Sequence, residues 1–232
     1  MRKVLLVLLV LVVGGVIATD RIGVRIAQDQ IGQQIQSQYN LLRQPDVKIH
    51  GFPFLTQAVG GEYDRIEVGI GDWTQEDVRV TDVKIEMRGL KAPLSDVTAG
   101  NSANMTVRTA TASAVIPYGA IQQRAPKEVK KIGPKGDDLQ VDLTGSLMGL
   151  PLNGTAVVSV KVVDKGLAIT PVSVGTGGAQ IPLNLIQRQL TWTVPVTDLP
   201  VGSRISEVQP TPEGLRVAAT AENLQLSKLA QS

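Results

Sequence analysis

The chain has 232 residues, of which 43% are hydrophobic and only 3% aromatic, so Val, Ile and Leu must fill the core. There is no cysteine and one histidine, which excludes a disulfide scaffold, Cys–His catalysis and Cys-based or multi-His zinc sites. Of the 23 basic residues, two lie in the first 18 positions; the remaining 21 balance the 21 acidic residues, and this neutrality removes the global electrostatic argument for nucleic-acid binding.

The N-terminal segment has the pattern of an export signal. Two basic residues precede an uncharged apolar run from Val4 to Ala18, which is shorter than the roughly 20 residues of a spanning helix. This pattern is typical of a signal peptide, and because apolar residues continue to Ile26 the alternative is an uncleaved anchor. No cysteine follows the run, so a lipoprotein anchor is excluded. We therefore expect residues 1–18 to be a signal peptide or N-terminal membrane anchor and residues 19–232 to form one exported domain.

An amphipathic helix is predicted from Asp20 to Leu42, with Thr19 or Asp20 as its N-cap. Its apolar positions recur at steps of four or five; they are Ile22, Ile26, Ile31, Ile35 and Tyr39. We expect this stripe to pack on a sheet, and its later members to border an apolar ligand cavity.

From Asp46 onward the sequence predicts eight to ten short strands. In residues 78–87 the apolar positions change parity near Thr81 and Asp82, which predicts a β-bulge or kink. Two hairpins are indicated by short loops that contain glycine, one over residues 157–174 and one over residues 204–226.

Two shorter helices are predicted, from Tyr118 to about Lys131 and from Pro182 to Gln189. The first carries a cationic patch whose members lie near one helical face: Arg124, Lys127, Lys130 and Lys131. Such a patch is either a solvated surface or a contact for anionic lipid headgroups, where each basic residue contributes about 1 kcal/mol.

Catalytic and cofactor-binding signatures are missing. Ser146 has the wrong offset for a nucleophile elbow, and the glycines at 175–178 lack the spacing of a phosphate-binding loop. Asp137 and Asp138 are typical of a solvated turn. His50 has no partner visible in the sequence, so a structural or exposed role is favoured. We therefore expect no catalytic residue, no metal and no cofactor.

Several segments resemble the actinobacterial LmeA-like family of envelope phospholipid-binding proteins, which is linked to mannolipid maturation in mycobacteria. They are residues 49–57 (IHGFPFLTQ), 61–68 (GEYDRIEV), 199–202 (LPVG) with Ile205, and 213–215 (EGL). The resemblance extends over nearly the whole chain. It implies an α+β, tubular lipid-binding-like fold, with a long amphipathic helix wrapped by a twisted, mostly antiparallel sheet. The resemblance implies no catalytic residues for this chain.

The expected function is lipid binding in the cell envelope, at the outer face of the cytoplasmic membrane. The protein would hold or transfer a phospholipid or polyprenyl lipid and support lipoglycan maturation. Its expected apolar cavity is lined by Ile26, Ile31, Ile35, Phe52 and Phe54. The cationic patch would contact the membrane surface, and no nucleic acid is expected as a partner. The alternatives are an envelope enzyme or enzyme accessory that acts on lipid-linked glycans, and an interaction domain with a filled core.

Overall fold

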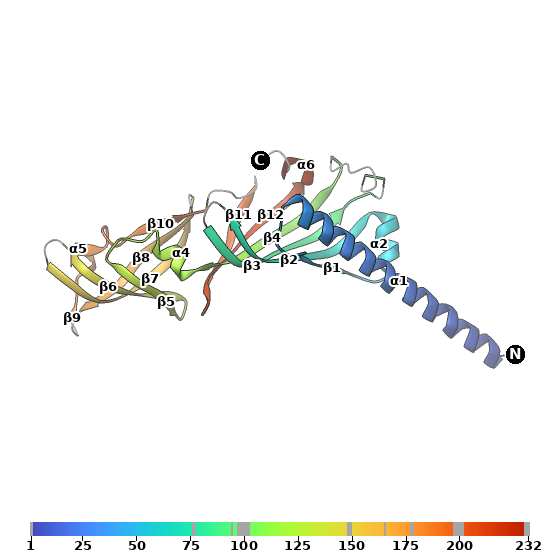
Figure 1. The fold of residues 1–232 in the computed structure, drawn as a ribbon, viewed down its shortest axis with the longest axis horizontal. Helices are drawn as coiled ribbons and strands as arrows, with labels where there is room; N and C mark the ends of the chain where they lie inside the picture. The colour runs from blue at the N-terminus through green and yellow to red at the C-terminus, as the bar shows by residue number, and fades with distance from the viewer. Residues whose placement is uncertain are drawn as a thin grey trace.

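The computed structural model describes residues 2–75, 78–93, 95–96, 103–147, 150–164, 166–176, 179–196 and 202–229. It shows an elongated α+β molecule in which two antiparallel sheets follow one another along the long axis (Figure 1). The predicted glycine loop at 177–178 and residues 199–201 of the family-like segment lie outside the described residues.

The first sheet has six strands. In spatial order they are β1 (Asp46–His50), β2 (Glu62–Gln75), β3 (Val78–Lys91), β4 (Thr106–Pro117), β12 (Gly214–Gln225) and β11 (Ser203–Pro210). The hairpin predicted over residues 204–226 is therefore confirmed as β11–β12. The predicted bulge is also confirmed, because Asp82 has a φ of 51° and the β3–β4 register shifts between Thr81 and Lys84. Such bulges bend a strand and increase its twist.

The second sheet also has six strands. In spatial order they are β10 (Trp192–Pro195), β8 (Gly166–Thr176), β7 (Leu150–Val163), β6 (Asp138–Leu147) and β5 (Val129–Lys135), while β9 (Ala179–Gln180) pairs separately with β8. The hairpin predicted over residues 157–174 is confirmed as β7–β8. The described part of the chain thus holds twelve strands, more than the eight to ten predicted. β9 and β10 are too short to show the alternation of apolar and polar residues by which a strand is recognised.

The N-terminal helix α1 (Arg2–Gln38) joins the apolar run and the amphipathic segment into one element. It packs mainly on β1 and on the short helix α2 (Phe54–Gly60), and its N-terminal half projects from the body (Figure 1). Wrapping of the sheet around this helix stays a prediction. Gly32 allows the chain to return closely, since a Cβ there would lie 3.1 Å from the Pro45 carbonyl oxygen. Within the described residues, no helix combines the length and apolarity needed to cross a membrane.

The two predicted short helices are shorter than expected; they are α4 (Tyr118–Gln122) and α5 (Leu183–Ile186). A further short helix, α6 (Leu226–Leu229), was not predicted. The prediction of a helix as far as Lys131 was wrong. Pro126 disfavours the helical conformation at the residue before it, and Val129 already begins strand β5.

Two apolar clusters form the interior. One lies in the second sheet and includes the fully buried Leu139, Leu167 and Ile169; the other lies between α1 and the first sheet. Strand β12 contributes Leu215 to one cluster and Leu224 to the other. The two clusters are thus parts of one continuous body.

Candidate functional site

The first sheet has one apolar and one polar face. Register partners across strands share a face, so the pairing defines two parallel rows. The apolar row is Val47, Val68, Ile85, Ala112 and Ala219. The neighbouring polar row is Lys48, Glu67, Glu86, Thr111 and Thr220.

The apolar face is incompletely covered at its centre. Helix α1 packs on β1, at one edge of the sheet. On β4, towards the other edge, Ala112 is exposed and Ala110 is only half-buried; on β3, their register partners Ile85 and Met87 are also half-buried. We call these four residues the open apolar strip. Across β4, the strip is continued by the small side chains of Ala219 and Ala221.

The structure divides the five residues expected to line an apolar cavity. Phe54 is buried, and Ile31 and Ile35 are half-buried against the cluster beneath α1. Ile26 and Phe52, however, are 53% and 59% exposed. Ile26 and Phe52 thus lie at the surface and not in the interior, and a role of the five residues in lipid binding stays a prediction.

The predicted stripe on α1 was correct for Ile31 and Ile35 and wrong for Ile22, Ile26 and Tyr39, which are exposed. The side chains that face the body follow steps of three and four; they are Asp20, Val24, Ala27, Ile31 and Ile35. This stripe passes through an aspartate and an alanine, so it is less conspicuous in the sequence than the isoleucines.

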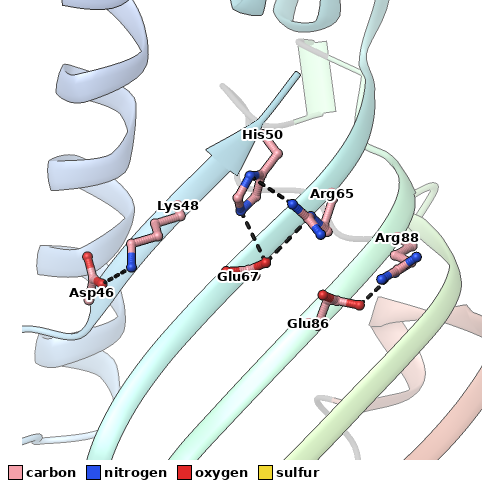
Figure 2. A network of polar contacts seen from close by, with 7 residues as sticks. All are labelled: Asp46, Lys48, His50, Arg65, Glu67, Glu86 and Arg88. Carbon is pink, nitrogen blue, oxygen red and sulfur yellow. Dashed lines mark hydrogen bonds and ion pairs between the residues drawn. The ribbon is translucent and has the colours of Figure 1, made fainter. Parts of the chain in front are cut away.

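The polar face carries a network of charged side chains from β1, β2 and β3 (Figure 2). Arg65 Nη2 lies 3.1 Å from His50 Nδ1, and His50 Nε2 lies 3.2 Å from Glu67 Oε1. Because arginine only donates, Nδ1 is the acceptor, which leaves the ring proton on Nε2, facing the carboxylate. The sequence did not reveal these partners, because they come from the neighbouring strand through the pairing of His50 with Arg65.

Two further ion pairs flank this histidine. Lys48 Nζ lies 2.9 Å from Asp46 Oδ2, and Arg88 Nε donates to Glu86 Oε1 at 2.6 Å. The hydrogen bond to Asp46 is the main reason why the pKa of Lys48 is raised. Opposite charges therefore compensate one another along this face.

A hollow of about 330 Å³ is lined mainly by residues of the polar row, although Val68 and Ile85 of the apolar row also border it. Its charged lining residues are Asp46, Lys48, Glu67, Lys84 and Glu86. Each already has an oppositely charged partner; that of Lys84 is Asp82, at 2.8 Å. The hollow thus offers little surplus charge to an ionic ligand. Within the described residues, no group of three metal-ligand side chains is found.

A second hollow of about 650 Å³ is lined by residues of β3, β4 and β12. Gly89 and Asn223 have φ angles of 61° and 53°, and both line it with Arg108. None of the five residues expected to line a lipid cavity borders either hollow. The open apolar strip, in which Ala112 is exposed, is the candidate for contact with acyl chains, because its side chains carry no charge.

The predicted cationic patch is present as a surface, although not on a helix. Arg124 and Lys127 lie in the turns after α4, whereas Lys130 and Lys131 are the second and third residues of β5, and all four are exposed. The register with β6 shifts between Val129 and Lys131, so the two lysines both face solvent. The patch belongs to the second sheet, far along the molecule from the projecting half of α1 (Figure 1).

Comparison with known proteins identifies the family. No curated protein and no solved structure matches the chain. The family model described as LmeA-like phospholipid-binding matches residues 18–220, a range that includes strands of both sheets and most of the apolar face. The chain therefore belongs to the LmeA-like phospholipid-binding family.

Proposed function

We propose that this protein binds a phospholipid by laying its acyl chains on the open apolar strip, and that it carries or transfers this lipid at the outer face of the cytoplasmic membrane. Family membership supports phospholipid binding. The observation that carries the proposed binding surface is the exposure of Ala112 at the centre of the apolar sheet face.

The chemistry of the strip suits a hydrocarbon chain. The small side chain of Ala112 on β4 is exposed, and the longer Ile85 and Met87 lie beside it on β3; on β12 the strip ends at Ala219 and Ala221, which are buried. Each methylene that moves from water onto such a surface contributes about 0.8 kcal/mol. Methionine adapts its shape to irregular partners. A polyprenyl chain has the same apolar chemistry and is the alternative cargo.

The proposed location rests on the basic flank and apolar run that precede the domain. A role in lipoglycan maturation would follow from lipid delivery in the cell envelope. The alternative of an envelope enzyme has weaker support, because the family is a lipid-binding family and the charged groups around the polar hollow are paired with one another.

Neighbouring substitutions on one strand test the strip. Ala112→Phe fills it, whereas Thr109→Phe adds a ring to the polar face, where Thr109 pairs with Arg88. Native mass spectrometry of the purified proteins should show phospholipid on the wild type and on Thr109→Phe, and severalfold less on Ala112→Phe. Circular dichroism and the melting temperature would confirm that both variants fold. Equal lipid occupancy in the two variants, or none in the wild type, would contradict the proposal.

Protease treatment of intact spheroplasts tests the location. An exported domain should be degraded, because it lies outside the cytoplasmic membrane. Complete protection, with degradation after lysis, would show that the domain is inside.

A further inference from the structure

Large apolar side chains are exposed on two neighbouring helices at one end of the body. Leu55 and Val59 are 40% and 80% exposed on α2, and Ile22 and Ile26 are 59% and 53% exposed on α1. Each pair is four residues apart, so its members lie on the same side of their helix. Phe52, just before α2, is 59% exposed. We call these five residues the α2 platform.

The two helices are joined firmly. Asp20 of α1 is 1% exposed, and its Oδ1 accepts the backbone N–H of Leu55 at 2.9 Å. Arg21 Nη2 donates to the other carboxylate oxygen at 2.6 Å, and its guanidinium carbon lies 5.2 Å from the centre of the Phe52 ring. Gly23 permits close approach, since a Cβ there would lie 3.5 Å from Leu55 Cδ2. The platform is thus a fixed surface and not a loose loop.

The platform lies beside the point where α1 leaves the body (Figure 1). Beyond that point, the described side chains of α1 include the exposed apolar residues Leu9, Val10, Leu11, Val12, Val13, Val16 and Ile17. At 1.5 Å per residue, the run from Val4 to Ala18 is about 22 Å long, shorter than the roughly 30 Å hydrocarbon core of a bilayer. A bilayer that takes up this run would bring its headgroup region to the platform.

We propose that the α2 platform is a membrane-contact surface whose apolar side chains insert among the headgroups of the bilayer that receives the N-terminal half of α1. The exposed Arg25 lies on α1 between Ile22 and Ile26, and its charge would complement anionic headgroups. Apolar side chains beside basic ones are the composition of helices that lie in a membrane interface. This surface is separate from the open apolar strip, so the inference rests on the proposed location at the membrane and not on the proposed cargo.

The platform also sets an orientation. With α2 at the bilayer, the second sheet and its cationic patch point away from it along the long axis of the molecule (Figure 1). Contact through the platform and contact through the cationic patch would therefore place opposite ends of the protein at the membrane surface.

Fluorescent labels can report which part touches lipid, because the chain has no cysteine of its own. We would place single cysteines by Leu55→Cys, Val59→Cys and, as an exposed apolar control in the second sheet, Val172→Cys, a position that is 44% exposed. The full chain would be labelled with an environment-sensitive dye and reconstituted into vesicles of phosphatidylcholine and phosphatidylglycerol. Labels at positions 55 and 59 should shift to shorter emission wavelengths and be quenched by lipid-borne nitroxides, whereas the label at position 172 should respond only to aqueous iodide.

Two results would overturn the inference. If labels at all three positions respond only to iodide while the protein is vesicle-bound, the platform does not contact lipid. If labels at 55 and 59 are shielded from both quenchers and cross-linking yields dimers, a second copy of the chain covers the platform instead.

Discussion

The carboxylate of Asp20 accepts a hydrogen bond from the backbone N–H of Leu55, 35 residues further along the chain, at 2.9 Å. The sequence suggested Thr19 or Asp20 as the cap of a helix that begins there; the structure places both inside α1, and Asp20 accepts a hydrogen bond from the first turn of α2. Burial acts to raise the pKa of Asp20, but the hydrogen bonds from the Leu55 backbone and Arg21 outweigh burial and lower the pKa. The ionised carboxylate is thus the form that joins the two helices.

Replacing Asp20 should loosen this joint. Asp20→Ala removes the acceptor of the Leu55 N–H, so the melting temperature should fall and the amides of Phe54 to Gly60 should exchange faster with solvent. Asp29→Ala, at an exposed position of the same helix, is the matched control and should change neither. Unchanged exchange in α2 of the Asp20 variant would show that the joint does not depend on this bond.

Acid should weaken the contact of Asp82 with Lys84 and Arg216. Hydrogen bonds from these two side chains lower the pKa of Asp82 below its ordinary value of 3.8. A lowered folded-state pKa contributes stability above the unfolded pKa, and this stability is lost as pH falls through the folded pKa. Because Asp82 is 39% exposed, the contribution is about 1 kcal/mol or less.

The measurement compares melting temperatures of the wild type and Asp82→Asn from pH 7 to pH 2.5. Asparagine tolerates the positive φ at this position, so the backbone should be kept. The wild type should be the more stable protein at pH 5–7, and its advantage should shrink below about pH 4. A pH-independent difference would exclude titration of Asp82 as its source.

A cavity in the second sheet should cost stability but leave lipid binding intact. Leu139 is fully buried in the cluster of that sheet, away from the open apolar strip. Leu139→Ala should lower the free energy of unfolding by about 2–5 kcal/mol, measured by urea denaturation. Val172→Ala, at an exposed site, should change it by about 0.5 kcal/mol or less. Loss of bound lipid in folded Leu139→Ala would mean that the second sheet takes part in binding.

His50→Ala should preserve lipid occupancy. The histidine belongs to a half-exposed ion-pair network on the face opposite the strip, and such networks contribute about 0–1 kcal/mol per pair. Native mass spectrometry and urea denaturation would check occupancy and stability together. A selective loss of lipid at unchanged stability would place a headgroup at the polar hollow.

Contact between the cationic patch and lipid headgroups can be tested by removing its charges. Changing Arg124, Lys127, Lys130 and Lys131 together to Gln should leave the fold intact, because all four are exposed. If the patch touches headgroups, the variant should bind anionic vesicles more weakly at low salt, and the difference should vanish at 1 M salt, where the Debye length is about 3 Å. Equal co-sedimentation of the two proteins at low salt would mean that the patch is only solvated.

Local features were predictable from the sequence. The two hairpins and the bulge at Asp82 depend on glycine, turn residues and the parity of a few side chains, all within about 20 residues. The family could be recognised for a similar reason, since short segments such as residues 49–57 carry it.

What escaped prediction depends on distant partners. The exposure of Ile26 and Phe52 is decided by where α2 and β1 meet α1, and the partners of His50 by the register of β1 with β2. The open apolar strip was equally hidden. In strand β4, Ala residues alternate with Thr and Ser. This pattern does not indicate that α1 packs on β1 and leaves the alanines of β4 uncovered.

The position of β12 in the first sheet has a consequence for the order of folding. β4 pairs with β3 early but meets its second partner, β12, only after about 100 further residues, as the contact between Thr111 and Thr220 illustrates with a separation of 109 positions. Until the β11–β12 hairpin arrives, β4 is an unpaired edge, and closing so long a loop slows folding. The alanines that continue the strip, Ala219 and Ala221, come with this last hairpin. A chain delivered from its N-terminus therefore completes its lipid-facing surface last, and an incomplete chain exposes an apolar sheet edge that needs protection from aggregation.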